Sequence, residues 1–329
     1  MTSRHTLEGV LVDPLDGAGP GRLVWEADRI VAVERLEGGP TEPLVFPGFV
    51  DLQVYEPAGL ARHGVTAYLL ATRRVQEVAD PLCLGLHLEG PFLNPDAAGA
   101  IPRDELTPVD LVALEEWLAS GLVRLVTLAP ELRHALAAIH HVAGRGAVAA
   151  IGHSHANAIT TLAAVNAGAR FATHVWNAMA PVRARATGPI PTLLLDQRVV
   201  LGVIADGRHL HPRIEQLTVA VAGPQRIALT SDLVAAPGQR ADGSLLGGSR
   251  CGAALVARMA RFGLAEAAAM ASLVPARVLG LADRGRLTPG FRADFAVLGS
   301  DFSPLRTVAA GVEVWALRYP ADELGRPPT

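Results

Sequence analysis

The segment Leu86-His87-Leu88-Glu89-Gly90-Pro91-Phe92-Leu93-Asn94 is the point from which the fold can be worked out. The apolar run from Leu82 to Leu88 predicts a buried β-strand, which ends at Glu89 because Gly-Pro follows. A carboxylate at the end of a buried strand costs free energy unless a partner compensates its charge. Two histidines, His153 and His174, each follow a later apolar run. We therefore treat Glu89 and these histidines as a candidate metal site.

The composition indicates a globular protein with a large core. Half of the 329 residues are hydrophobic and the mean hydropathy is +0.29, which argues against disorder. No apolar run reaches the roughly 18 residues of a membrane helix, and the first residues lack the apolar region of a signal peptide. Cys83 and Cys251 form no disulfide framework. We expect a cytoplasmic protein without a membrane partner.

The charged residues restrict the chemistry further. A net charge of −3 and the absence of a basic run predict no nucleic-acid partner. All 29 basic residues are arginine, so no lysine can form a Schiff base or, once carbamylated, bridge two metal ions. A phosphate group would have to be bound by Arg, His or backbone N–H groups.

The middle of the sequence alternates between β-prone and helical runs. Eight short apolar runs lie at about 45–51, 65–71, 82–89, 123–128, 147–152, 170–174, 198–205 and 226–231. Most spacers predict helices, for example Leu106–Ser120, Glu131–Ala143, Asn157–Ala167 and Arg213–Ala222. This rhythm predicts an α/β fold, a (β/α)8 TIM barrel. A doubly wound sheet would alternate in the same way, but no Gly-rich phosphate-binding segment follows the first run.

Both ends of the sequence are rich in β-prone runs instead. These runs are Val10–Val12, Arg22–Trp25, Arg29–Val33, Ala293–Leu298 and Gly311–Trp315. We expect the two ends to pair as a small β-sandwich domain made of residues 1–45 and 285–329. The barrel would then comprise residues 46–284.

Six of the eight apolar runs end in ionisable or amide side chains, and in such barrels the strand ends meet at one rim. The side chains are Asp51 and Gln53, Glu89, His153 and His155, His174, Asp206 and His209, and Asp232. One carboxylate with two imidazoles leaves a coordination position for water, as in catalytic zinc sites. We expect Glu89, His153 and His174 to bind one metal ion.

Asp232 and His209 are then free for catalysis. A carboxylate beside a metal-activated water can accept its proton and pass it to a leaving amine. His209 can hydrogen-bond a carbonyl oxygen as it becomes an oxyanion. These groups together predict hydrolysis of an amide or a related bond, and the residues alone name no substrate.

Segments along the whole sequence resemble the amidohydrolase superfamily and, within it, the N-acetylglucosamine-6-phosphate deacetylase family. The most specific is His87–Asn94, which resembles the HLEGPF motif. The others are Phe46–Asp51, His63–Ala67, Gly152–Ser154, Thr173–Met179, Ile204–His209 and Leu229–Asp232, with Gly285–Asp294 as a mark of the superfamily. The resemblance implies deacetylation of an N-acetyl amino sugar, giving glucosamine 6-phosphate and acetate from N-acetylglucosamine 6-phosphate.

The resemblance implies the metal ligands and the base that the residues had already indicated. It also implies phosphate binding by Arg185, carbonyl polarisation by His209, and a homodimer. Further substrate contacts are implied at Asn177, Ala178, Ala100 and Gly248. The implied cofactor is a divalent metal ion, with zinc expected and iron or cobalt as alternatives that suit the same ligands.

The sequence departs from the family pattern in three places. Gln53 and Tyr55 stand where many amidohydrolases have a His-x-His pair for a second metal, so we predict one ion. Ala97-Ala98 and Ile101 stand where the family has a basic pair and a phosphate-binding His. Losing one such contact costs about 1.5–3 kcal/mol. The segment between the first two strands is short, which predicts a more open pocket.

These departures leave alternatives open. The substrate could be non-phosphorylated, or Arg183, Arg208 or an arginine of a partner subunit could replace the missing contact. Another amidohydrolase activity, for example on N-acyl amino acids, is a second reading. A barrel that binds a sugar without hydrolysing it is a third.

Overall fold

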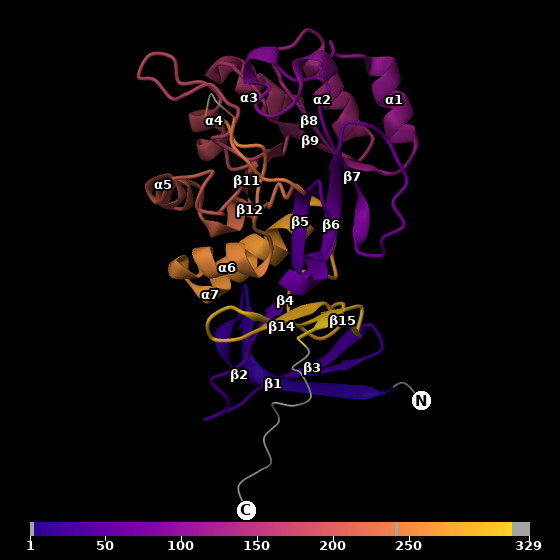
Figure 1. Ribbon diagram of the computed structural model, residues 1–329, viewed down its shortest axis with the longest axis vertical. Helices are drawn as coiled ribbons and strands as arrows, with labels where there is room; N and C mark the ends of the chain where they lie inside the picture. The colour runs from indigo at the N-terminus through magenta and orange to yellow at the C-terminus, as the bar shows by residue number, and fades with distance from the viewer. Residues whose placement is uncertain (1–2, 241–242, 318–329) are drawn as a thin grey trace, which may run out of the picture.

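The structure, a computed structural model, describes residues 3–240 and 243–317. The chain forms two sheets: eight strands of the middle segment build a parallel barrel, and seven strands from the two ends build a separate sheet next to it. Figure 1 shows the second sheet beneath the barrel, with indigo and yellow segments side by side. The predicted (β/α)8 barrel with a small β domain is confirmed.

The barrel strands follow one another around the sheet in sequence order. They are β5 (Phe49–Val54), β6 (Val65–Thr72), β7 (Cys83–Glu89), β8 (Val123–Leu128), β9 (Val148–Ile151), β10 (Phe171–Ala172), β11 (Val200–Val203) and β12 (Ile227–Leu229). No ladder joins β12 to β5. The gap closes just beyond β12, where Asp232 N donates to Gln53 O and Tyr55 N donates to Leu233 O, each at 2.9 Å. Residues of the candidate site therefore complete the barrel.

Helices cover the outside of the barrel, several of them shorter than predicted. They are α1 (Leu111–Ala119), α2 (Ala135–Gly144), α3 (Ala158–Ala167), α4 (Ile190–Leu195), α5 (Pro212–Ala222), α6 (Ala253–Met259), α7 (Leu264–Ala268) and α8 (Val274–Val278). The helix predicted from Leu106 begins only at Leu111, because the Asp110 carboxylate accepts from Val112 N and Ala113 N and caps it there. The first spacer contains one 3-10 turn, Leu60–His63.

The small sheet has the strand order β15-β14-β13-β4-β1-β2-β3. Its strands are β1 (Arg4–Asp13), β2 (Gly17–Glu26), β3 (Arg29–Arg35), β4 (Leu44–Pro47), β13 (Phe295–Leu298), β14 (Pro304–Ala309) and β15 (Val312–Ala316). The sandwich predicted for this domain takes the form of a single sheet. Strand β4 holds the two ends together, because it pairs in parallel with β1 and antiparallel with β13. The domain boundaries at 45/46 and 284/285 we keep as a proposal.

The prediction of one strand over residues 45–51 was wrong, since the chain changes sheets at Gly48. Gly48 N donates to Asp294 O of the small domain at 2.9 Å. A Cβ atom at this position would lie 2.1 Å from Thr66 Oγ1 of β6, so only glycine allows the close approach. The change of sheet lets β5 enter the barrel directly.

The barrel interior below the site is packed with apolar side chains. Val50 and Leu52 of β5 meet Leu69, Leu125 and other inward-facing residues there. Because apolar side chains fill the interior, the polar residues at the strand ends lie at one rim of the barrel. In the described ranges, no helix combines the length and apolar character needed to cross a membrane.

Candidate active site

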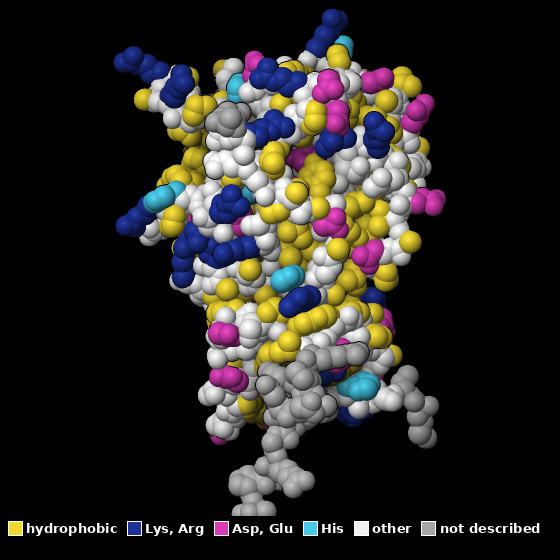
Figure 2. Space-filling view, viewed as in Figure 1, with side chains coloured by type: hydrophobic (Ala, Val, Ile, Leu, Met, Phe, Trp, Pro, Cys, Tyr) yellow, Lys and Arg dark blue, Asp and Glu magenta, His cyan; other side chains and the backbone are white. Residues whose placement is uncertain are grey.

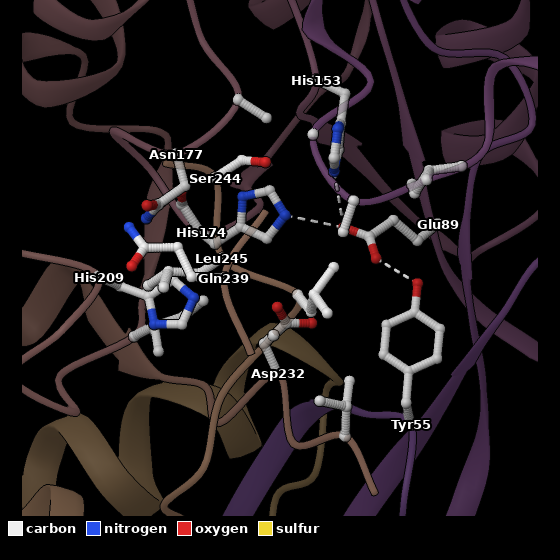
Figure 3. A pocket seen from close by; sticks show the side chains of 18 of the residues that line it. Tyr55, Glu89, His153, His174, Asn177, His209, Asp232, Gln239, Ser244 and Leu245 are labelled. Carbon is white, nitrogen blue, oxygen red and sulfur yellow. Dashed lines mark hydrogen bonds and ion pairs between the residues drawn. The ribbon is translucent and has the colours of Figure 1, made fainter. Parts of the chain in front are cut away.

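Glu89, His153 and His174 converge at the carboxyl-terminal rim of the barrel. Glu89 is the last residue of β7, and the two histidines follow β9 and β10. Their Nε2 atoms lie 3.1 Å (His153) and 2.8 Å (His174) from Glu89 Oε1. All three side chains are buried, and their ligand atoms lie within 4.8 Å of one another. Figure 3 shows both imidazoles pointing at this carboxylate.

The hydrogen bonding of His153 shows that these residues fit a cation. His153 Nδ1 lies 2.8 Å from the carbonyl oxygen of Ala97, which can only accept, so Nδ1 carries the hydrogen. In a neutral imidazole, the lone pair of Nε2 then faces a carboxylate oxygen. Two acceptors in contact require a positive charge between them, either a proton or a metal ion. The Ala97 carbonyl thus sets the tautomer that metal binding needs.

Two side chains of β5 and its following loop hold Glu89 from the other side. Gln53 Nε2 donates to Glu89 Oε1 at 2.9 Å, and the Tyr55 hydroxyl donates to Oε2. Burial, followed by the nearby charges of Glu89 and Asp232, raises the pKa of Tyr55 well above its usual value, so its hydroxyl stays a donor. Burial alone would raise the pKa of Glu89, but hydrogen bonds from His153 and His174 bring it well below its usual value.

Asp232 lies beside this cluster and accepts from Gln53 Nε2 at 3.1 Å. The same amide therefore joins the candidate base to Glu89. Burial first, and then the charges of Glu89 and Asp51, raise the pKa of Asp232 well above its usual range. In Figure 3 the Asp232 carboxylate points into the space between His174 and Tyr55.

Three of these residues have an unusual backbone conformation. His153, His174 and Asp232 have φ values of 49°, 28° and 49°, in the left-handed region that side chains rarely adopt. Each lies two or three residues beyond the end of a barrel strand, where the chain turns out of the sheet. Strain of this kind persists where surrounding structure enforces it and is concentrated at functional sites.

His209 is held by Asp206, which follows β11. Asp206 Oδ2 lies 2.9 Å from His209 Nδ1, and Asp206 Oδ1 accepts from the backbone N–H groups of Arg208 and His209. Burial alone would raise the pKa of Asp206, but the hydrogen bonds from His209 and the backbone lower it to about 2. The His209 ring therefore has a fixed orientation beside an ionised carboxylate.

A cavity of about 460 Å³ opens in front of these groups. The three predicted ligands, Asp232 and His209 line it, as do the predicted substrate contacts Asn177, Ala178 and Ala100. Two predicted contacts, Arg185 and Gly248, are not among its lining residues. Gly248 N donates to Asp232 O at 2.7 Å and a Cβ there would meet Ser231 O at 1.9 Å, so this glycine packs behind the base. Arg185 is exposed in the loop before α4.

Sequence reasoning missed Glu131, which we predicted to begin a helix. It lies in the loop between β8 and α2, where its carboxylate accepts from Asn94 Nδ2 (2.8 Å), Ser154 Oγ (2.7 Å) and His155 N (2.6 Å). These donors belong to the two loops that follow Glu89 and flank His153. Only the position of Glu131 directly after an apolar run could have indicated such a role.

Comparisons with known proteins identify relatives of this chain. The model of the amidohydrolase family matches residues 59–314. The chain is 32% identical to the N-acetylglucosamine-6-phosphate deacetylase of Bacillus subtilis, over 69% of this chain and 64% of that protein. It is 31% identical to the N-acetylgalactosamine-6-phosphate deacetylase of Escherichia coli O157:H7, over 82% of this chain and 88% of that protein.

A solved structure is similar over nearly the whole chain. The N-acetyl-D-glucosamine-6-phosphate deacetylase of Mycobacterium smegmatis, a D267A mutant in complex with N-acetyl-D-glucosamine-6-phosphate, superposes with a TM-score of 0.87 at 28% identity. The match covers 95% of this chain and 99% of that one. The chain therefore belongs to the amidohydrolase family, whose members are hydrolytic enzymes. The three relatives described above are named as deacetylases of N-acetylated hexosamine 6-phosphates.

Proposed function

We propose that this protein hydrolyses the acetamide of an N-acetyl amino sugar, with N-acetylglucosamine 6-phosphate as substrate and glucosamine 6-phosphate and acetate as products. The observation that carries the proposal is the juxtaposition of a three-residue ligand cluster with a separate buried carboxylate, Asp232, in one cavity. The names of the matched relatives support the substrate class.

Glu89, His153 and His174 would hold one divalent metal ion. When bound, such an ion polarises the acetamide carbonyl and makes a water molecule more acidic. Gln53 and Tyr55 support a single ion, because each directs a hydrogen-bond donor rather than a lone pair at Glu89. Two imidazoles and one carboxylate match the ligands of catalytic zinc sites, and iron or cobalt suits them as well.

Asp232 serves as general base and then as general acid. Its carboxylate takes a proton from the attacking water and delivers it to the nitrogen that leaves as the sugar amine. The bridge from Gln53 keeps the carboxylate beside the ligand cluster during both transfers.

His209 stabilises the oxygen of the acetamide carbonyl. Because Nδ1 donates to Asp206, Nε2 is the nitrogen left for the substrate. The Asp206 carboxylate fixes the ring so that Nε2 faces the oxygen on which negative charge develops. Asn177 and Ala178, close to His174 in the sequence, line the cavity together with Ala100, and these three residues would contact the sugar.

A non-phosphorylated N-acetyl substrate is the second candidate. It is favoured by Ile101, an apolar residue that lines the cavity where the family pattern has a phosphate-binding histidine. A binding protein without catalysis is less well supported, because sugar binding alone does not need a free carboxylate beside a metal site.

Acetate release from a substrate panel tests these alternatives. The panel comprises the 6-phosphates of N-acetylglucosamine and N-acetylgalactosamine, the two free sugars, and an N-acetyl amino acid. We expect the highest kcat/KM with N-acetylglucosamine 6-phosphate. Equal rates for phosphorylated and free sugar would favour the second candidate, and no acetate from any sugar would refute the deacetylase proposal.

We also propose a homodimer. Apolar side chains are exposed on two neighbouring helices: Ile159 (81% exposed) and Leu162 on α3, and Leu195 on α4. Contact with a second subunit would bury these side chains. Size-exclusion chromatography with light scattering should give a mass of two chains for the wild-type protein. The variant Ile159→Glu should give the mass of a single chain. The cytoplasmic location remains a prediction.

A further inference from the structure

The arginines around the cavity differ in what they already bind. Arg73 lines the cavity, but its Nε atom forms an ion pair with Glu105 at 2.5 Å. Arg240 donates to the carbonyl oxygens of Gly99 and Ala100 at 3.0 and 2.7 Å. Both guanidinium groups therefore fasten the loop after β7 to the barrel rim. Arg73 is already paired with a carboxylate, and both terminal nitrogens of Arg240 already donate to backbone carbonyl oxygens.

Arg208 is different. It lines the same cavity, and its side chain is exposed. Among the described residues, no carboxylate forms an ion pair with its guanidinium and no side-chain hydrogen bond engages it. Its backbone, in contrast, is fixed, because Arg208 N donates to Asp206 Oδ1 at 2.8 Å. Arg208 is thus an arginine of this cavity with a fixed backbone, and within the described ranges its guanidinium has no carboxylate partner.

The other candidates for an anion contact are placed less well. Arg183 and Arg185 are exposed in the segment between β10 and α4, and neither lines the cavity of its own chain. Figure 1 shows a loop of this segment projecting away from the barrel near α4. Ile101 is buried and apolar, so the position from which the family pattern supplies a histidine offers no donor.

We propose that Arg208 binds the 6-phosphate of the substrate, so that this chain selects phosphorylated N-acetylhexosamines through a residue next to His209. The proposal rests on the proposed deacetylase function. Consecutive Cα atoms are about 3.8 Å apart. With His209 at the acetamide, the long side chain of its neighbour can therefore reach a distant substituent of the same sugar. A guanidinium matches a phosphate with two parallel hydrogen bonds, which a single-point donor cannot do.

The test compares three arginine variants of the metal-loaded, full-length protein. Arg208→Gln removes the proposed contact, Arg185→Gln removes the contact implied by family resemblance, and Arg213→Gln is a matched control. Arg213 is exposed on α5 and its side chain donates only to Gln216 among the described residues. For each variant, kcat/KM is measured with N-acetylglucosamine 6-phosphate and with N-acetylglucosamine. Calorimetry measures the binding of glucosamine 6-phosphate and of glucosamine.

We expect Arg208→Gln to lower kcat/KM for the phosphorylated sugar by about 10- to 100-fold, because glutamine can replace the charge-assisted pair of hydrogen bonds only with a neutral one. Turnover of the free sugar should change less than about threefold. In calorimetry, the affinity of glucosamine 6-phosphate relative to glucosamine should fall by the same factor as kcat/KM for the phosphorylated sugar. Arg213→Gln should leave all four values unchanged.

The proposal is overturned by an unchanged phosphate preference in Arg208→Gln, or by a preference lost only in Arg185→Gln. A wild-type protein that binds and processes both sugars equally would also overturn it, while leaving the deacetylase function intact. If no sugar releases acetate, the deacetylase function fails. The calorimetric comparison of glucosamine 6-phosphate with glucosamine then still decides the role of Arg208.

Discussion

The hydroxyl group of Tyr55 donates a hydrogen bond to Oε2 of Glu89, the carboxylate oxygen that faces away from the two histidines. By family resemblance Tyr55 stands where many amidohydrolases have a ligand for a second ion, and here its hydroxyl instead holds Glu89, a proposed ligand of the single ion. Partners of this kind orient metal ligands and strengthen metal binding.

Tyr55→Phe should therefore weaken metal binding. Removal of the hydroxyl leaves Glu89 Oε2 without its donor, and we expect the zinc dissociation constant to rise by about 10- to 100-fold. The measurement is a competition titration with a chromogenic chelator. Tyr68→Phe is the matched control, because the Tyr68 hydroxyl donates to Asp80 at 3.0 Å and is remote from the ligands. Equal zinc affinities in both variants would contradict the proposed role.

Asp232→Asn should separate catalysis from metal binding. The amide oxygen of asparagine can still accept from Gln53, so the local structure is preserved, but the side chain can no longer take a proton. We expect kcat to fall by about 10²- to 10⁴-fold with unchanged metal content. Asp110→Asn, which keeps the cap of α1, should retain full activity. A variant Asp232→Asn with more than a tenth of wild-type kcat would exclude this residue as the base.

Removal and return of the metal should show one functional site per chain. Dialysis against a chelator should abolish activity, and titration with zinc should restore it fully at one equivalent. The reason is that Gln53 and Tyr55 direct donors at Glu89, which disfavours a second cation. The melting temperature should rise over the same titration, because the ion binds only the folded chain. A requirement for two equivalents would refute the single-ion site.

Glu131→Gln should loosen the loops that flank His153. The carboxylate accepts three hydrogen bonds, and an amide in its place turns a donor toward groups that also donate. We expect about tenfold weaker zinc binding and a matching loss of kcat/KM. Glu115→Gln on α1, where the carboxylate contacts His141 and Arg145, controls for the charge change. If both variants bind zinc alike, Glu131 has no positioning role.

Glu215→Gln should lower stability without affecting the site. This buried carboxylate on α5 forms ion pairs with Arg258 at 2.7 Å and with Arg261. Removing its charge leaves two arginines without a partner, and we expect a loss of about 3 kcal/mol in the free energy of unfolding. Urea denaturation measures this loss, while zinc affinity should match the wild type. A change below about 1 kcal/mol would show that the pair behaves as an exposed one.

Features that repeat along the chain were predictable from the sequence. The alternation of apolar and helical runs predicted the barrel, and the polar residues at strand ends predicted a cluster that the structure brings together around Glu89. Such patterns are local, because they depend on residues that lie only two to four positions apart in the sequence.

Contacts between distant loops were not predictable in this way. Glu131 meets Asn94 and Ser154, and Arg73 meets Glu105, through the arrangement of neighbouring strands alone. The change of sheet at Gly48 was missed for the same reason, because its cause is Thr66 on the next strand. Strand β14 also went unpredicted, although its neighbours β13 and β15 were found.

The position of β4 between β1 and β13 has a consequence for synthesis on the ribosome. Strands β1–β4 emerge first, yet one edge of β4, with Leu44, Val45 and Phe46, is covered only when β13 arrives. At about 5–20 residues per second the intervening barrel takes on the order of ten to fifty seconds to translate. During that interval the nascent chain exposes an apolar strand edge that can pair with other chains. A chaperone that shields this edge should therefore raise the yield of the native protein.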